Sequence, residues 1–212
     1  MSPSPRRTRG LDTTDLALVA AFAALISVCA ILPSIKVGAG LVPITLQTFG
    51  VLLTGAVLGP KRGFLAVCLY LLVGVAGVPV FSGGAAGPAV LQGPTMGYLV
   101  GFPLAAGLCG LLVHRLAPRA TPALRGVVVF ACGLLSSALF IHTLGMAGLV
   151  WRADLTWQQA WNVDKVFWIG DVIKNVAMAI VALAVLRAFP DLVVRRGARP
   201  RDLADASPAG AQ

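Results

Sequence analysis

Long apolar runs separated by short polar segments dominate the chain. Runs at about 15–32, 45–58, 126–151 and 166–186 are each typical of one membrane-spanning helix, and a further apolar stretch fills residues 63–114. A helix needs roughly 20 apolar residues to cross a bilayer. The stretch 63–114 contains no Asp, Glu, Lys or Arg and is too long for a single span, so it predicts two helices and a connecting loop. The pattern therefore predicts an all-α polytopic membrane protein with six transmembrane helices.

The loop between the third and fourth predicted helices, residues 79–93, reads PVFSGGAAGPAVLQG. It has the glycine content of a flexible segment but none of the charge of a typical solvated loop. Irregular backbone at membrane depth is tolerated only where protein covers it or where it lines a cavity. We therefore expect a re-entrant loop over a binding site, with Ser82 as its only polar side chain before Gln92. An ordinary glycine-rich extracellular turn is the alternative.

All four tryptophans lie between Trp151 and Trp168, and tryptophan is enriched at the membrane surface. In this segment Thr156 and Gln159 have the spacing of a capping box, which marks the start of a helix. The segment therefore predicts a short interfacial helix between the fifth and sixth transmembrane helices.

The charges are distributed asymmetrically about these runs. The chain carries 17 Lys and Arg against 8 Asp and Glu, and most of the bases fall in alternate loops or terminal segments. The exceptions are Lys36, Arg152, Lys165 and Lys174. This is the positive-inside pattern rather than a nucleic-acid-binding face. It predicts a multi-pass protein of a bacterial cytoplasmic membrane, with both termini and a tight basic turn at 59–62 in the cytoplasm.

We expect three regions along the chain. Residues 1–14 form a disordered basic arm, residues 15–188 the transmembrane domain, and residues 189–212 a disordered, Arg-rich tail. The four cysteines lie far apart inside apolar runs and lack the spacing of a zinc site, and no GxxxxGK[ST] phosphate-binding motif is present. With no nucleophile and base at a recognisable spacing, we expect neither an enzyme nor a bound cofactor.

Two charged residues interrupt the last apolar run. Asp171 and Lys174 each cost roughly 2.5 to 3.5 kcal/mol near the centre of a membrane helix, so neither can face lipid. Their spacing of three puts them on one helix face. They are the predicted floor of a binding site, with Asn175 as a third polar group; a buried ion pair that only orients the helix is the alternative. His142 is the only histidine in the run at 126–151, and it has no second ligand at metal-binding spacing. We therefore expect it to pack in the core instead of binding a metal ion.

Four segments resemble the BioY family. They are VPITLQTFGVLLTGAVLGPKRG at 42–63, GVAGVPVFSGG at 74–84, GPTMGYLVGFP at 93–103 and GDVIKN at 170–175. The family comprises the biotin-specific substrate-binding (S) components of energy-coupling factor transporters, and the resemblance spans roughly residues 15–188. It implies high-affinity biotin binding and uptake across the membrane. It also implies assembly with a transmembrane coupling protein and two ATP-binding cassette ATPases that supply the energy.

The resemblance also assigns roles to particular residues. Asp171 and Lys174 match the family's biotin contacts in the last helix. The first helix would dock the coupling protein through small residues spaced by four, which are Ala17, Ala20, Ala21 and Ala24. Apart from the resemblance, we expect Phe81, Tyr98 and Trp168 to form aromatic walls around a ligand ring. Thr45, Gln47, Ser82 and Gly84 complete the predicted substrate contacts.

Biotin suits such a site, because its ureido ring offers two N–H donors and a carbonyl, its thiophane ring is apolar and its valerate is an anion. Asp171 can accept from the ureido N–H groups, and Lys174 can meet either the ureido oxygen or the valerate. A self-sufficient secondary transporter or facilitator, with Asp171 as a proton or ion relay, is the alternative function.

Overall fold

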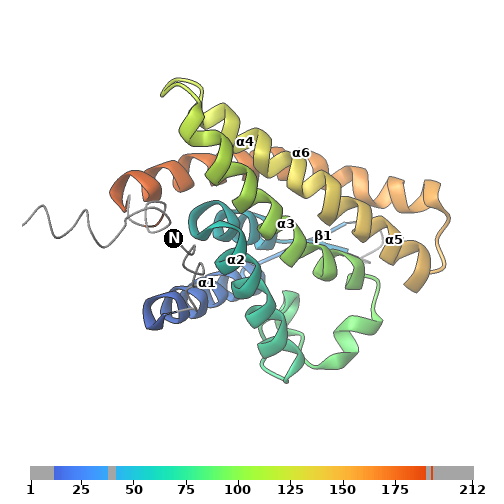
Figure 1. Ribbon diagram of the computed structural model, residues 1–212. Coiled ribbons are helices and arrows are strands. Elements are labelled where there is room, and N and C mark those ends of the chain that lie inside the picture. The colour runs from blue at the N-terminus through green and yellow to red at the C-terminus, as the bar shows by residue number, and fades with distance from the viewer. Residues whose placement is uncertain (1–11, 38–41, 190–191, 193–212) are drawn as a thin grey trace, which may run out of the picture.

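The computed structural model describes residues 12–37, 42–189 and 192, and shows a bundle of helices with one small β-hairpin (Figure 1). The main helices are α1 (Thr13–Ile31), α2 (Gln47–Val75), α3 (Met96–Leu116), α4 (Arg125–Ser136), α5 (Thr143–Arg152) and α6 (Trp157–Ala188). Three short 3₁₀ helices are η1 (Ser82–Gly84) and η2 (Pro88–Gln92), between α2 and α3, and η3 (Ala117–Arg119). The hairpin pairs β1 (Ile35–Val37) with β2 (Val42–Ile44) in antiparallel register. The predicted helical fold is confirmed, and the hairpin is the one unpredicted β element within the described ranges.

The predicted disordered arm and tail lie mostly outside the described residues. The described part of the arm is ordered, because Asp12 caps α1 and Thr13 begins it. The Asp12 carboxylate accepts from the backbone N–H of Asp15 at 2.8 Å, and the Asp15 carboxylate accepts in return from the Asp12 backbone. This reciprocal capping box satisfies two of the N–H groups that a helix start leaves unpaired.

Five segments of the described chain are long and apolar enough to cross a membrane. They are Thr13–Ile31, Gln47–Val75, Met96–Arg119, Arg125–Arg152 and Trp157–Ala188. Large apolar side chains, among them Ile169, Ile173 and Ile180 of α6, are exposed on the outside of the bundle. Such faces are costly in water and suited to lipid. The chain is a multi-pass membrane protein, and the count of six spans stays a prediction because α2 is continuous where two spans were expected.

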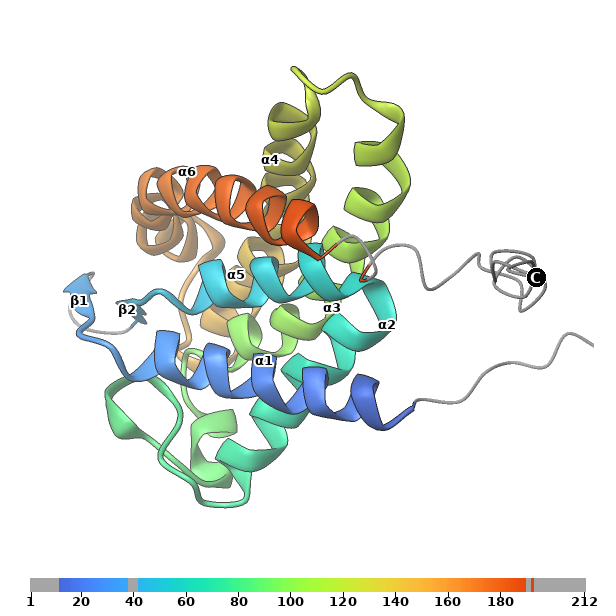
Figure 2. The same ribbon diagram turned by 90° about the vertical axis from the view of Figure 1, so that its left-hand side faces the viewer.

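α2 bends sharply at Gly59, where φ is 79° and ψ is −179°. Glycine takes this conformation without a Cβ clash. The following Pro60 has no N–H, so the carbonyl of Ala56 loses its usual helical donor. The ring of His114 on α3 replaces it, with Nε2 3.0 Å from the Ala56 oxygen. The turn predicted at 59–62 is therefore a bend inside α2, and Figure 2 shows its two halves running in different directions.

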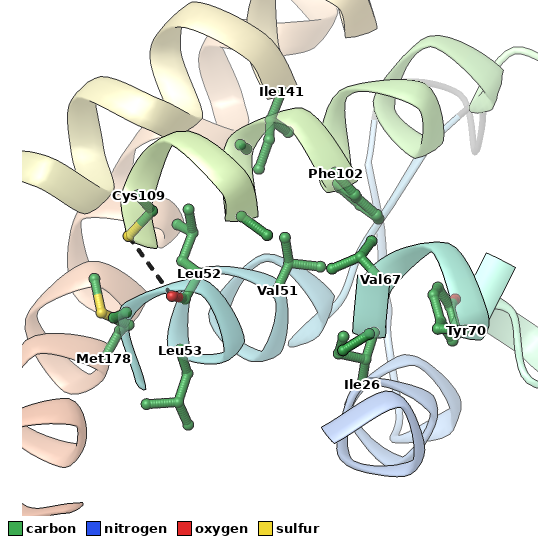
Figure 3. Packing of buried hydrophobic residues seen from close by; sticks show 14 of the residues in the cluster. Ile26, Val51, Leu52, Leu53, Val67, Tyr70, Phe102, Cys109, Ile141 and Met178 are labelled. Carbon is green, nitrogen blue, oxygen red and sulfur yellow. Dashed lines mark hydrogen bonds between the residues drawn. The ribbon is translucent and has the colours of Figure 1, made fainter. Parts of the chain in front are cut away.

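The core of the bundle surrounds α2, which packs against α1, α3 and α6. Figure 3 shows Val51 and Leu52 from the first half of α2 among buried side chains from the neighbouring helices. The thiol of Cys109 on α3 lies 3.6 Å from the Leu52 carbonyl oxygen, and it is buried as expected for a small apolar side chain. A Cβ on Gly63 would lie only 2.8 Å from the Cα of Gly55, so the two halves of α2 meet through glycines.

The helix predicted at 126–151 is present but contains one widened turn. α4 passes into a π-helical segment, η4 (Ser137–His142), and then into α5 without interruption. Thr143 Oγ1 donates to the Ala138 carbonyl five residues back at 3.0 Å. Single π-helical turns within α-helices occur frequently at functional sites. Here the widened turn ends at His142, which is fully buried.

The predicted interfacial helix is not a separate element. Its capping box is confirmed, because Thr156 and Gln159 bond each other's backbone. The helix that begins there, however, continues unbroken as α6 to Ala188. Residues 157–169 contain neither proline nor glycine, so nothing stops the helix before the span.

Arg62 joins both ends of the described fold to the bend in α2. Its Nη1 lies 3.1 Å from Asp15 Oδ1 at the start of α1, and its Nη2 donates to the Leu192 carbonyl at 3.0 Å, beyond the end of α6. Its Nε donates to the Leu58 carbonyl at 3.0 Å. One guanidinium thus places the beginning of α1, the bend in α2 and the region after α6 at the same end of the molecule.

Candidate functional site

A cavity lies among α2, α3, α6, the π-helical segment, β2 and the loop that carries η1 and η2. The volume of the cavity that the centre of a water molecule can occupy is about 170 Å³. Most of its wall is apolar or aromatic, and the polar groups gather on α6 and the start of α2. Its lining includes Ile44, Phe81, Val90, Leu99, Phe102, Ile141 and Phe167 on the apolar side, and Thr45, Gln47, Thr48, Ser82, Asp171 and Lys174 on the polar side. A mostly apolar wall with a few placed polar groups is the common form of a small-molecule site.

Asp171, Lys174 and Thr48 form a closed triangle at the polar end of this cavity. Lys174 Nζ lies 2.8 Å from Asp171 Oδ1 and donates to Thr48 Oγ1 at 3.2 Å, while the Thr48 hydroxyl donates to the same Asp171 oxygen at 2.9 Å. Asp171 is 2% exposed, whereas the Lys174 side chain is 11% exposed. The predicted pairing of Asp171 and Lys174 on one helix face is confirmed, and Lys174 is the more accessible partner.

The second oxygen of Asp171 faces His142. His142 Nε2 lies 3.2 Å from Asp171 Oδ2, which is an ion-pair distance without hydrogen-bond alignment. On the other side of the ring, Nδ1 lies 2.9 Å from Asp164 Oδ2. The ring also stacks on Trp168, with centroids 4.6 Å apart and planes 20° apart. Packing alone is therefore an incomplete interpretation of His142, because it bridges two carboxylates.

Asp164 is 0% exposed and anchors the side of the network away from Lys174. Its oxygens accept from the Tyr98 hydroxyl at 2.9 Å and from the Trp168 indole N–H at 3.0 Å, in addition to His142. A buried carboxylate needs several donors to offset the loss of water. These three donors come from α3, α6 and the π-helical segment, so Asp164 ties together three elements around the cavity.

Seven of the nine predicted substrate contacts line the cavity, and whether they bind a ligand stays a prediction. The two that do not are Gly84 and Trp168. Gly84 is exposed on the loop with φ 74°, although its neighbours Ser82 and Ala85 reach the cavity. Trp168 stacks on His142 and donates to Asp164, so it supports these two side chains and does not line the cavity. Asn175 donates to the Asp171 carbonyl at 2.8 Å and is not among the lining residues.

The other predicted polar contacts are partly engaged within the protein. Gln47 accepts from Thr45 Oγ1 at 3.0 Å and donates to the Tyr70 hydroxyl at 2.7 Å, which fixes the entry into α2. The Ser82 hydroxyl, by contrast, is buried against the cavity with no hydrogen-bond partner among the described residues. A buried polar atom left unpaired costs about 1 to 3 kcal/mol, so a ligand group that met it would be favoured.

The four predicted docking alanines lie on one exposed face of α1. Ala17, Ala20, Ala21 and Ala24 are all exposed, whereas Val19, Ala23 and Ile26 on the other face are buried in the core. The structure therefore leaves this stripe of small side chains uncovered, and its role in docking stays a prediction.

Fold and site together define an integral membrane protein with an internal chamber suited to a small, partly polar ligand. Comparison with known proteins makes this specific. The sequence profile of the BioY family matches residues 4–191, and the chain belongs to the BioY family. The resemblance in the sequence motifs is therefore confirmed.

The relatives cover more than four fifths of the chain. The biotin transporter BioY of Rhizobium etli is 38% identical over 186 residues, which cover 87% of this chain and 100% of that protein. The biotin transporter BioY of Rhodobacter capsulatus is 38% identical over 195 residues, covering 86% and 98%. The crystal structure of an S-component for biotin from an ECF-type ABC transporter matches with a TM-score of 0.77 at 26% identity, covering 84% of this chain and 95% of that one. These relatives are transport proteins and not enzymes.

Proposed function

We propose that this protein is the S-component of an energy-coupling factor importer, and that it binds biotin in the cavity and delivers it across the membrane. The observation that carries the proposal is the Asp171–Lys174 pair, which a membrane helix holds at the polar end of an otherwise apolar chamber. A charged pair of this kind is costly at membrane depth, and a polar ligand offsets that cost. The names of the BioY relatives identify the ligand as biotin.

The chemistry of the chamber matches the two halves of biotin. Lys174 and Asp171 offer a cationic donor and an anionic acceptor side by side, which suits either the ureido ring or the carboxylate end. The apolar wall, with Phe81 and Phe102, suits the thiophane ring and the hydrocarbon chain. Ser82 adds, at the loop side of the chamber, a hydroxyl that has no hydrogen-bond partner within the described part of the chain.

Both ends of the described fold lie at one end of the molecule, and this supports six crossings. A chain that starts and finishes on the same side must cross an even number of times. The bend at Gly59 supplies the extra reversal if each half of α2 counts as one crossing. With the basic residues Lys61, Arg62 and Arg115 near that end, the positive-inside rule assigns it to the cytoplasm. The loop at 79–93, which contributes Phe81 and Ser82 to the chamber wall, would then cover the chamber from outside.

The partners would be a transmembrane coupling protein and two ATP-binding cassette ATPases. The exposed alanine stripe on α1 supports a docking role, because small side chains let a second helix approach closely.

The direct test is binding of radiolabelled biotin to the purified protein, together with mass spectrometry of any vitamin that co-purifies. We expect saturable, one-to-one binding that unlabelled biotin displaces and riboflavin and thiamine do not. Uptake in cells should require the coupling protein and the ATPases. Absence of biotin binding would contradict the proposal, and uptake that persists without ATPases but collapses with the proton gradient would indicate a secondary transporter.

A further inference from the structure

A chain of four ionisable side chains runs from the chamber into the interior of the bundle. Lys174 contacts Asp171 at 2.8 Å, Asp171 faces His142 at 3.2 Å, and His142 contacts Asp164 at 2.9 Å. Lys174, Asp171 and His142 line the chamber. Asp164 is not a lining residue and lies behind His142. The last three groups, Asp164, His142 and Asp171, are called the acidic–histidine trio below.

The contacts within the trio favour a particular number of bound protons. A neutral imidazole carries one N–H and one lone pair, so with a carboxylate on each side one carboxylate would face the lone pair. Two acceptors in contact repel each other, whereas an imidazolium 3.2 Å from Asp171 Oδ2 attracts the carboxylate even without hydrogen-bond alignment. One proton more than two carboxylates and a neutral ring hold would make both contacts of the ring attractive.

The groups around the trio do not supply this proton in another way. Tyr98 and Trp168 already donate to Asp164, and Thr48 and Lys174 already donate to Asp171. With the extra proton, the two carboxylates balance Lys174 and the imidazolium, and the buried cluster is neutral. Without it, the cluster carries one net negative charge inside a membrane bundle, which is costly.

A metal ion is a poor alternative for the same cluster. The two carboxylates lie on opposite sides of the imidazole ring, so they cannot converge with a ring nitrogen on one ion. In agreement with this, no group of three potential ligands with metal-binding geometry occurs in the described chain.

We propose that Asp164, His142 and Asp171 form a buried proton-binding site, and that the bound proton positions the Asp171 carboxylate for the ligand. His142 is a positioning residue in this proposal, because it touches Asp171 and reaches the ligand through it. Loss of the proton would leave Asp171 next to a lone pair and would add a negative charge beside the chamber. Affinity for biotin, whose identity as ligand rests on the proposed function, should therefore fall as pH rises through the loss of this proton.

The proton itself can be observed without any ligand. The sequence contains two histidines, His114 and His142, so protein labelled with ¹⁵N-histidine gives two sets of ring signals, and His142→Gln assigns them. We expect both ring nitrogens of His142 to be protonated at pH 7.5. In Asp164→Asn, which removes one of the two carboxylates, the proton should leave at lower pH. A neutral His142 ring at pH 7.5 in the intact protein would overturn the proposal.

The functional consequence is tested by biotin binding between pH 6 and 9, where the carboxylate of biotin stays ionised. We expect wild-type affinity to fall roughly tenfold or more at the alkaline end, the scale of one charge-assisted hydrogen bond. Asp164→Asn should show the same fall at lower pH, and His142→Gln should bind weakly throughout, without the step. Asp154→Asn, on an exposed loop residue, is the matched control and should follow the wild type.

The outcomes separate the two proposals. An unchanged pH profile in folded His142→Gln would assign the fall to another group and contradict the proton site. If the wild type binds no biotin at any pH, the proposed function fails, and the ¹⁵N spectra still decide whether the trio holds its proton. Because His114→Gln assigns the same two sets of signals, a His142 variant that does not fold leaves this decision intact.

Discussion

The ammonium of Lys174 has three N–H donors, and Asp171 and Thr48 engage two of them in the described structure. Its position on the chamber wall leaves the third donor for a ligand. Lys174 therefore acts as the part of the network that a ligand can reach, whereas Asp171 is held from three sides by Lys174, Thr48 and His142.

Lys174→Ala should weaken biotin binding by about 1.5 to 3 kcal/mol, the usual cost of losing a charged hydrogen bond. Affinity is measured with radiolabelled biotin at fixed pH. Lys165→Ala is the matched control, because Lys165 lies on the same helix, is exposed and contacts Asn162 instead of the chamber. Equal affinity of Lys174→Ala and wild type would remove Lys174 from the site.

A comparison of biotin with its neutral carboxamide tells which end of the ligand meets Lys174. If Lys174 binds the carboxylate, wild-type protein should prefer biotin and Lys174→Ala should lose that preference. If Lys174 binds the ureido oxygen, the substitution should weaken both ligands equally.

At the residue scale, the sequence predicts the floor of the site but not its support. Asp171 and Lys174 stand out because a charge inside an apolar run has a known cost. Asp164 does not stand out, because it precedes the run and lies next to Lys165, as many interfacial residues do. The partners of His142 are 22 and 29 positions away on another helix, and only the packing of α6 against the π-helical segment brings them together.

At the scale of elements, the contact between α2 and the following loop depends on Gly74. The loop inserts Phe81 against this glycine, where a Cβ would overlap the ring, and Phe81 packs edge-on against Tyr70 with centroids 5.5 Å apart. Phe81 is 2% exposed and also lines the chamber. The position of the loop over the chamber is therefore linked to one missing methyl group on α2.

Gly74→Ala should displace Phe81 and lower both thermal stability and affinity for biotin, the latter by roughly tenfold if one well-packed aromatic contact is lost. Gly107→Ala is the matched control. It lies inside α3, where the nearest atom to a Cβ is a Phe64 carbon at 3.7 Å, so the change should be tolerated and even stabilise the helix. Unchanged binding by Gly74→Ala would show that the loop does not depend on this contact.

The boundaries of most helices follow from the sequence, and the exceptions have local causes. Gly59 and Pro60 predict the reversal in α2, yet His114 supplies the missing hydrogen bond and lets helical geometry continue on both sides. The capping box predicts the start of α6. No proline or glycine follows it before the span, so α6 continues through the membrane instead of ending as a short interfacial helix. The widened turn in η4 has no sequence signature, because it depends on how α4 and α5 pack.

At the scale of the whole molecule, α1 has one face in the core and another on which four alanines form a stripe beside the exposed side chains of Leu16 and Val28. Ala21→Trp should leave biotin binding by the isolated protein unchanged, because Ala21 is exposed and is not among the residues that line the chamber. It should abolish co-purification with the coupling protein and ATP-driven uptake, because a bulky ring prevents close helix contact. Ala177→Trp, on the exposed face of α6, is the control. Loss of uptake in both variants would remove the special role of α1.

Arg62 has a mechanical consequence for the assembled bundle. Its three contacts tether the start of α1, the chain after α6 and the bend in α2 to a single planar group. A force applied to either tethered end is thus transmitted first to the bend, and the compartment at the opposite pole is shielded from it. A partner that pulls on this end of the protein should therefore act on the bend before it deforms the chamber at the other end.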